Sequence, residues 1–294
     1  DTCSTCWEQL SAAAYSSLTL TELEPGNHTF YVKARDIAGA ESEIIQFPDI
    51  DNPSEPNYWK VLPVQGDILL VDDFSLDSDN DALYWYKSVL DTLMGNNNYS
   101  VWEIGKTLPY SSNDVLANLS YFSKIIWFSA YLGNETYDEA EQSIYSYVIS
   151  GGNIFINTTE IRSNTFLPFP INNTFLLNPD GRMLSGKTIE STISSDFNIV
   201  TSTLISVSIK SFTPDSSKFY NINSLYNLSE PGSGDSWTGK PNVCSIGQFQ
   251  VSPTQLSGKV VFMSIPLHNG SRPIMETDGS VETFLDYLLN IEFQ

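Results

Sequence analysis

The sequence predicts an α/β fold, in which a doubly wound, mostly parallel sheet carries a β-rich insertion and follows a smaller β region. Three observations predict it. Short apolar runs at 68–71, 124–129 and 153–157 are separated by segments with helical periodicity. Residues 160–256 instead hold short alternating runs and no long helix, and residues 14–50 alternate between turns. Strands that alternate with helices are typical of a parallel sheet covered on both faces.

Each element of the α/β domain, residues 66–294, has its own local signal. Helical spacing of apolar residues predicts four helices, and Asp79 and Thr136 are suitable N-terminal caps for the first and the third. Glu139 stands three residues after Thr136, which is a capping-box pattern. The expected strands are 68–71, 99–104, 124–129, 153–157 and 259–265, and the expected helices are 79–93, 113–119, 136–149 and 281–291.

The first 50 residues resemble the last strands of a fibronectin type III or Ig-like sandwich. In the run 28–36 (HTFYVKARD), Phe30 and Val32 share one face, and Tyr31 and Lys33 share the other. The first strands of such a sandwich have no counterpart, so this β piece is partial. Either the chain has been cut, or another chain supplies strands to the unpaired edge. Residues 51–65 carry three prolines and are expected to be a linker or an extended crossing strand.

Composition indicates an acidic, exported protein. The chain has 294 residues, of which 41% are hydrophobic, and 35 acidic against 14 basic residues give a net charge of −21 and a pI near 4.2. Such a charge repels nucleic acid and anionic membranes. No apolar run approaches the roughly 18 residues of a transmembrane helix. Abundant Asn, Ser, Thr and Tyr with little Lys favour an extracellular or cell-surface location, with protein partners, further domains of one polypeptide or self-assembly.

Cysteines and glycosylation sequons bear on the expected extracellular location. Cys3 and Cys6 form a C-x-x-C, and Cys244 stands far away. Zinc would need about four ligands, so a local disulfide, or one between Cys244 and either of the two, is expected. Sequons matter only if the producing cell glycosylates, and they occur at Asn27, Asn98, Asn118, Asn134, Asn157, Asn172, Asn227 and Asn269.

Five segments of the second domain carry a family resemblance. GDILLVDD, YSVWEI, KIIWFS, SYVISGGNIFIN and GKVVFMSIPL, in this order, resemble the class I glutamine amidotransferase-like fold, a flavodoxin-like architecture. The resemblance is closest to divergent, non-amidotransferase relatives that occur beside fibronectin-like domains in large secreted bacterial proteins. The family's Cys nucleophile would fall in the stretch 155–160, which has no Cys. Its His matches His268, but the acid two residues further on is Gly270. The resemblance therefore implies the fold without amidotransferase activity.

An acidic loop is the first candidate site, because ligands of doubly wound sheets bind beyond the carboxyl ends of the strands. Its carboxylates are hard-oxygen ligands of the kind that Ca²⁺ or Mg²⁺ prefers. An EF-hand is excluded, since Ala82 and Ser88 stand where it needs Gly and an acid. The alternative is that one acid caps the following helix and the others are solvated. The candidate metal ligands are Asp72, Asp73, Asp77, Asp79 and Asp81.

Two further sites are weighed against structural roles. Thr158 or Thr159 could act as a nucleophile with His268 as base and Glu160 or an Asp as orienting group, which would make the chain a divergent hydrolase. Trp237, in the Gly/Ser loop 229–242, is expected to be exposed and is the candidate for a carbohydrate-binding contact. The favoured hypothesis is a non-catalytic extracellular structural or interaction module of a larger secreted protein, with the hydrolase and the carbohydrate-binding module as alternatives.

Overall fold

The computed structural model describes residues 7–11, 20, 23–49, 58–74, 77–104, 112–129, 136–159, 161, 166–202, 208–274 and 279–294. The chain divides into two compact units, Asp1–Val64 and Gln65–Gln294. The expected β region 1–50 belongs to the first unit, and the expected α/β domain 66–294 belongs to the second.

The described residues of the first unit form short antiparallel strand pairs. β1 (Gly26–His28) pairs with β4 (Trp59–Val61), and β2 (Phe30–Val32) pairs with β3 (Ile45–Phe47). Strand β4 lies within the expected linker 51–65, so this part of the linker is joined to the first unit by its pairing with β1. None of the described residues of this unit is buried. The expected fibronectin-like sandwich stays a prediction.

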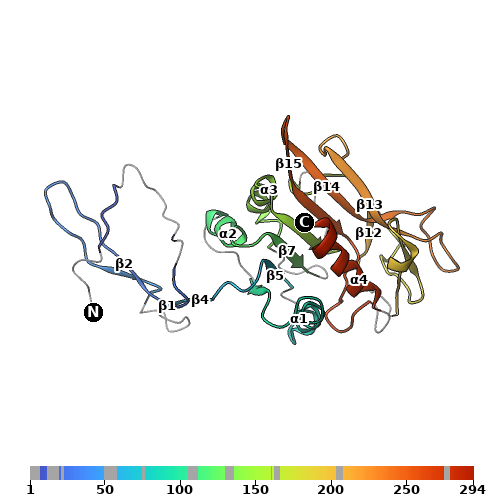
Figure 1. The fold of residues 1–294 in the computed structure, drawn as a ribbon, viewed down its shortest axis with the longest axis horizontal. Helices are drawn as coiled ribbons and strands as arrows, with labels where there is room; N and C mark the ends of the chain where they lie inside the picture. The colour runs from blue at the N-terminus through green and yellow to red at the C-terminus, as the bar shows by residue number, and fades with distance from the viewer. Residues whose placement is uncertain are drawn as a thin grey trace. The chain divides into compact units, whose positions relative to one another are not determined.

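The second unit is a mixed α/β structure built on one large sheet, which confirms the α/β class (Figure 1). Among the described residues, β15, β8, β7, β5 and β6 run parallel, and the strands beyond β15 are antiparallel. In the order in which they lie side by side, the strands are β11 (Ile199–Val200), β10 (Thr188–Ser191), β13 (Asn221–Leu228), β14 (Asn242–Ser252), β15 (Gln255–Met263), β8 (Asn153–Asn157), β7 (Lys124–Phe128), β5 (Ile68–Asp72) and β6 (Ser100–Glu103).

Helices cover both faces of the parallel strands. Alternate strand residues such as Leu70 and Phe155 pack with α1 (Asp81–Met94) and α4 (Ser280–Tyr287), which a π-helical turn, η2 (Leu288–Glu292), continues. The residues between them, such as Val71 and Ile156, pack with α2 (Ser112–Leu119) and α3 (Glu141–Ile149). Because both faces are buried, the strands read as continuous apolar runs in the sequence. Figure 1 shows the two helix pairs on opposite sides of the sheet.

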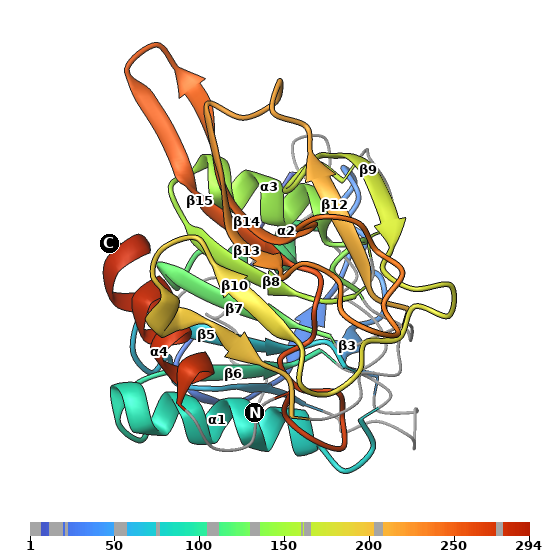
Figure 2. The same cartoon turned by 90° about the vertical axis from the view of Figure 1, so that its right-hand side faces the viewer.

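The insertion 160–256 extends the central sheet rather than forming a separate layer of its own. Four of its strands, β10, β11, β13 and β14, continue the sheet on the side of β15. The other two, β9 (Ile171–Leu176) and β12 (Lys210–Pro214), form a small antiparallel ladder, and a 3₁₀ turn, η1, spans Ser195–Phe197. Figure 2 shows the long hairpin of β14 and β15 reaching beyond the helices of this unit.

Two helix starts differ from the sequence-based expectation. Helix α1 begins at Asp81 instead of residue 79, after Asn80 in the left-handed conformation with φ 57°. Helix α3 begins at Glu141 instead of residue 136, because residues 137–140 form turns. A carboxylate lies at each of these turns: Asp77, from the loop just before α1, and Asp73, from a distant part of the chain, before α3. In the part of the chain that the structure describes, no helix combines the length and the apolar character needed to cross a membrane.

Candidate functional site at the carboxyl edge of the sheet

Asp73, directly after β5, is a buried carboxylate that ties two strands and a helix start together. Its oxygens accept hydrogen bonds from the backbone N–H of Thr136 at 2.7 Å, from that of Tyr137 at 2.9 Å and from the indole Nε1 of Trp127 at 2.9 Å. Asp73 therefore caps the turn that leads into α3, a role that the sequence assigned to Thr136. Burial raises the pKa of Asp73 to about 6, while these three donors act in the opposite direction.

Asp77 performs the corresponding role for α1. Its Oδ2 accepts a hydrogen bond from the backbone N–H of Ala82 at 2.7 Å, in the first turn of the helix. Asp79 was the expected cap, but it is exposed, as is Asp81. The physical reason is that Asn80, in the left-handed conformation, turns the backbone so that the helical N–H groups face Asp77.

Asp72 completes the acidic loop and is almost fully buried, with 9% of its surface exposed. Its Oδ1 accepts a hydrogen bond from the backbone N–H of Phe74 at 3.0 Å, and burial raises the pKa of Asp72 to about 6. The five acids of the loop therefore differ in burial and in hydrogen-bond partners. Within the described residues, no three His, Cys, Asp or Glu side chains gather as a metal-binding group. The expected Ca²⁺ site stays a prediction.

Asn157, the last residue of β8, is a buried polar side chain that makes four hydrogen bonds at this edge. Its Oδ1 accepts hydrogen bonds from the hydroxyl of Tyr86 and from the backbone N–H of Leu267, both at 2.8 Å. Its Nδ2 donates to the carbonyl oxygens of Ile265 at 2.7 Å and Met263 at 3.3 Å. The side chain is 1% exposed and uses its whole hydrogen-bonding capacity. Its sequon is therefore inaccessible in the folded chain.

His268 follows β15 and lies at the same edge. Its Nδ1 accepts a hydrogen bond from the backbone N–H of Gly270 at 3.1 Å, and its ring centroid is 5.8 Å from that of Trp85 in α1. The imidazole is 5% exposed, and burial lowers its pKa to about 4, so it is neutral at pH 7. The acidic neighbour Asp81 acts in the opposite direction on this pKa. His268 is thus joined to α1, near the end of the acidic loop.

Gly270 stands where the resembling family carries its acid, and the backbone there disfavours any side chain. Its φ is 88°, in the left-handed region, and an added Cβ would approach the ring of Phe74 to 3.0 Å. The loop after β15 therefore packs directly on the loop after β5. A carboxylate side chain at this position would strain the backbone and press on the ring of Phe74.

Thr158 is the remaining member of the expected hydrolytic group. It is 1% exposed, and its backbone N–H donates to the carbonyl oxygen of Met263 at 3.1 Å. Glu160 lies outside the described residues, as do Cys3 and Cys6. The third cysteine, Cys244, is fully buried and free of any bridge within the described part of the chain.

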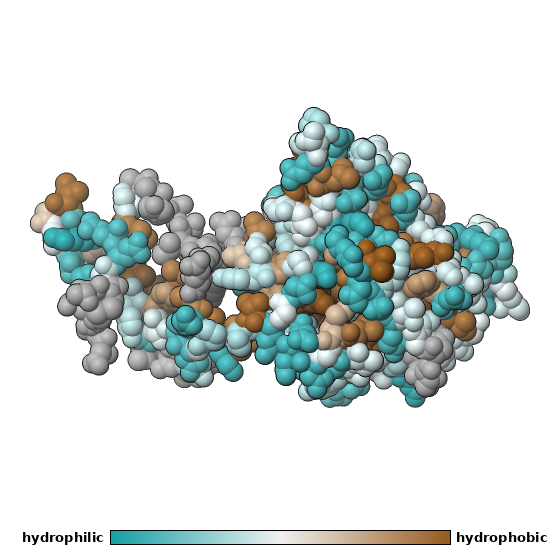
Figure 3. All heavy atoms as spheres, in the orientation of Figure 1, coloured by the Kyte–Doolittle hydropathy of each residue, from teal (hydrophilic) through white to brown (hydrophobic). Residues whose placement is uncertain are grey.

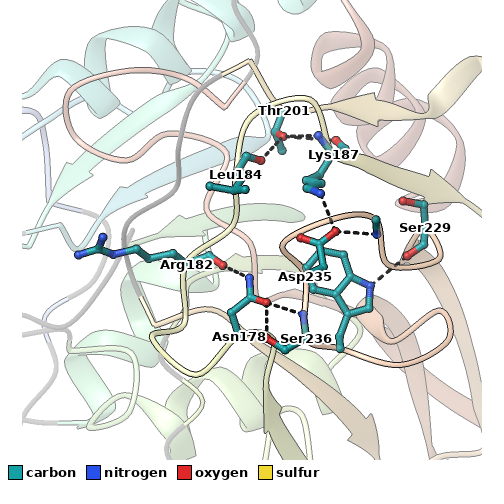
Figure 4. Close-up of polar contacts among 10 residues, drawn as sticks. Asn178, Arg182, Leu184, Lys187, Thr201, Ser229, Asp235 and Ser236 are labelled. Atoms are coloured by element: carbon teal, nitrogen blue, oxygen red, sulfur yellow. Dashed lines mark hydrogen bonds and ion pairs between the residues drawn. The ribbon is translucent and has the colours of Figure 1, made fainter.

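Trp237 is buried, so its expected exposure is wrong. It is 7% exposed, and its Nε1 donates to the carbonyl oxygen of Ser229 at 3.1 Å. The ammonium of Lys187 lies 5.9 Å from the ring centroid and 2.5 Å from Oδ2 of Asp235 (Figure 4). Asn178 accepts hydrogen bonds from the N–H and the hydroxyl of Ser236. These contacts fold the Gly/Ser loop onto the sheet and bring the indole into the core.

Sequence reasoning missed Asn157, Tyr86 and Trp85 as members of this edge. Asn157 carries a signal that could have been used, because an amide directly after a buried apolar run ends up at the carboxyl edge of a parallel strand. Tyr86 and Trp85 lie on a predicted helix, and nothing in their spacing distinguishes them from ordinary core residues.

Comparison with known proteins adds little to this geometry. No protein-family model matches the chain, and no curated protein matches it in sequence. One similar structure is a family 42 glycoside hydrolase β-galactosidase from G. stearothermophilus, with 8% identity and a TM-score of 0.43 over 79% of this chain. The chain spans 30% of that enzyme's length. Another is a putative ThuA-like protein from Bacteroides uniformis, with 8% identity and a TM-score of 0.41, covering 77% of this chain and 91% of that one. Likenesses at this level carry no argument about activity.

Proposed function

We propose that this chain is a non-catalytic extracellular or cell-surface structural or interaction module of a larger secreted protein or assembly. The observation that carries the proposal is that polar side chains at the carboxyl edge make hydrogen bonds within the fold. Asp73, Asp77 and Asn157 are bonded to backbone groups of neighbouring loops and helices. They hold the fold together at the edge where a doubly wound enzyme binds its substrate.

We infer for each unit the finer fold that the sequence suggested. The second unit would be a divergent, flavodoxin-like relative of the glutamine amidotransferase-like proteins, and the first a partial fibronectin-like piece. The export setting is supported by the net charge of −21 and by the Asn-, Ser- and Thr-rich composition. Sequon asparagines Asn27, Asn118 and Asn172 are exposed, in contrast to Asn157.

The hydrolase alternative is disfavoured by the surroundings of its proposed residues. A general base must reach the proton that it removes from the nucleophile. His268 instead accepts a backbone hydrogen bond through Nδ1, and Gly270 replaces the expected acid. Thr158 and His268 are both buried, at 1% and 5% exposure. The same edge in an enzyme would present its nucleophile and base to a substrate.

A hydrolase panel separates the two functions. The wild-type chain, His268→Ala and, as a matched control in the other unit, His28→Ala are assayed against chromogenic esters, glycosides and peptides. The module predicts no turnover that depends on His268. Hydrolysis by wild type and His28→Ala that disappears in His268→Ala, with unfolding midpoints measured for all three, would overturn the proposal.

A further inference from the structure

Lys187 and Asp235 form an ion pair that differs in burial from the other ion pairs of the described residues. Nζ of Lys187 is 2.5 Å from Oδ2 of Asp235, and the two side chains are 15% and 0% exposed. In the other pairs the carboxylate side chain is 22% to 60% exposed, at a surface rich in hydrophilic residues, shown in teal in Figure 3. Because both charges lose hydration in a buried pair, a neutral product of the two groups would remove a cost.

The surroundings of this pair exclude water. The indole ring centroid of the buried Trp237 is 5.9 Å from Nζ of Lys187. The backbone of Gly232 lies against the pair, because a Cβ added there would be 3.5 Å from Nζ and 3.6 Å from Oδ2 of Asp235. The amine and the carboxyl group therefore meet in a closed site that solvent does not dilute.

The two oxygens of Asp235 differ in their hydrogen bonds. Oδ2 accepts from the ammonium of Lys187 and from the backbone N–H of Gly232, the latter at 2.9 Å. Oδ1 is buried and has no hydrogen-bond partner among the described residues. A buried acceptor without a donor is costly, and an amide formed from this side chain would keep only one oxygen. The contacts therefore suit an amide at Asp235 better than a carboxylate.

Nζ of Lys187 is also close enough to react with the carboxyl carbon of Asp235. Oδ2 is about 1.23 Å from that carbon, so Nζ lies within about 3.7 Å of Cγ. Reacting atoms held about 3 to 3.5 Å apart react as one molecule rather than by collision. The N–H of Gly232 faces Oδ2, where negative charge develops as an amine adds to the carbon. A lysine amine in an apolar site is an established nucleophile.

We propose that Lys187 and Asp235 condense to an isopeptide bond in the folded second unit. The bond between Nζ of Lys187 and Cγ of Asp235 forms, and the bond between Cγ and Oδ1 breaks. Two of the three ammonium protons leave with Oδ1 as water, and the third stays on the amide nitrogen, so no other reactant is needed. The two charges cancel, and Oδ2 remains as the carbonyl oxygen that accepts the N–H of Gly232.

The bond joins positions that lie far apart in the chain. Lys187 directly precedes β10, and Asp235 follows β13, so the closed loop contains β10, β11, β12 and β13. A covalent link that closes a long loop stabilises the fold by restricting the unfolded chain, as a disulfide does. The inference goes beyond the proposed function, because it requires only the folded second unit and neither a partner nor a substrate.

Intact-mass spectrometry of the reduced and denatured full chain, made in a host that does not glycosylate, tests the proposal. Wild type, of 32.8 kDa, is expected about 18 Da below its sequence mass, which is the loss of one water. Lys187→Met is expected at its full sequence mass. Lys240→Met is the matched control, because it removes the lysine of the exposed pair with Glu190 and should retain the loss of one water.

Asp235→Asn distinguishes the isopeptide bond from other dehydrations and does not depend on the folding of Lys187→Met. Its side-chain amide would condense with Lys187 by loss of ammonia, so the mass should fall by about 17 Da instead. Trypsin should release from wild type and from Asp235→Asn one branched peptide that joins the segments around positions 187 and 235.

The mass, and not the stability, decides the outcome, since Lys187→Met loses a buried contact with or without the bond. Wild type at its full sequence mass would overturn the proposal and leave the two groups as an ion pair. A loss of water that persists in Lys187→Met would also overturn it, because this amine would not be involved. Neither result affects the module hypothesis, which fails only through hydrolysis that depends on His268.

Discussion

Replacing Asn157 by Asp tests how the carboxyl edge is held with the smallest change in shape. The Nδ2 group of Asn157 donates to the carbonyl oxygens of Met263 and Ile265. Asn157→Asp puts an oxygen where that donor stood, so two hydrogen bonds disappear and a carboxylate faces two carbonyl oxygens in a site that is 1% exposed. The Oδ1 contacts with Tyr86 and Leu267 can remain.

The magnitude follows from the bonds that are lost. The carbonyl of Met263 keeps the N–H of Thr158 as a donor, so the loss of the donor to the Ile265 carbonyl is the larger effect, at about 1 to 3 kcal/mol. An uncompensated buried charge adds to this. We expect Asn157→Asp to lower the free energy of unfolding by about 3 to 5 kcal/mol at pH 7. Burial raises the pKa of the introduced carboxyl, so protonation restores a donor at low pH. The penalty should therefore shrink as the pH falls from 7 to 4.

Urea unfolding followed by tryptophan fluorescence measures the effect. Asn223→Asp is the matched control, because Asn223 is exposed on β13 and the same change there should stay within about 0.5 kcal/mol. A penalty for Asn157→Asp below about 1 kcal/mol, or one that does not shrink at low pH, would refute the inferred hydrogen-bond network.

Two further predictions concern buried charges. Burial raises the pKa of Asp72 and that of Asp73 from 3.8 to about 6, so the contribution of each to stability is complete below pH 4 and is lost as the pH rises through 6. Each carboxyl accounts for about 3 kcal/mol. Asp73→Asn should therefore remove about half of the pH dependence of the urea midpoint over this window, and an unchanged pH dependence would contradict the raised pKa of Asp73. Lys187→Met leaves the carboxylate of Asp235, whose side chain is 0% exposed, without its cation, and should lower the free energy of unfolding by about 3 kcal/mol. Lys240→Met is the control, because it breaks an exposed pair and should leave the unfolding midpoint nearly unchanged. Equal effects of the two variants would contradict the burial of the first pair.

Local sequence signals identified the elements that are buried on both faces. The runs 68–71, 124–129 and 153–157 were expected as strands, and β5, β7 and β8 lie there. Apolar runs of this length, bounded by segments with helical periodicity, favour buried strands over helices. Helix starts were less predictable, because Asp73 comes from a different strand to cap the turn before α3. A capping-box pattern cannot reveal a competing carboxylate from elsewhere in the chain.

The positions of the candidate residues relative to the sheet also followed from the sequence. Asp72, Asp73, Thr158 and His268 follow predicted strands, and parallel strands bring their carboxyl ends to one edge. The interactions that these side chains make did not follow from the sequence. Trp237 was expected to be exposed because Gly and Ser surround it, yet the indole is buried and contacts Ser229 of its own loop and the distant Lys187.

The sequence by itself determined the α/β class, the positions of the buried strands and the acidic character, because apolar periodicity and net charge are local or additive properties. Only the tertiary structure decided what the polar side chains do. Asp73 binds Thr136 across 63 residues, and Asn157 binds Leu267 across 110. A buried polar group takes whichever donor or acceptor the fold brings within about 3 Å. That partner is fixed by packing between distant segments, which no pattern of neighbouring residues specifies.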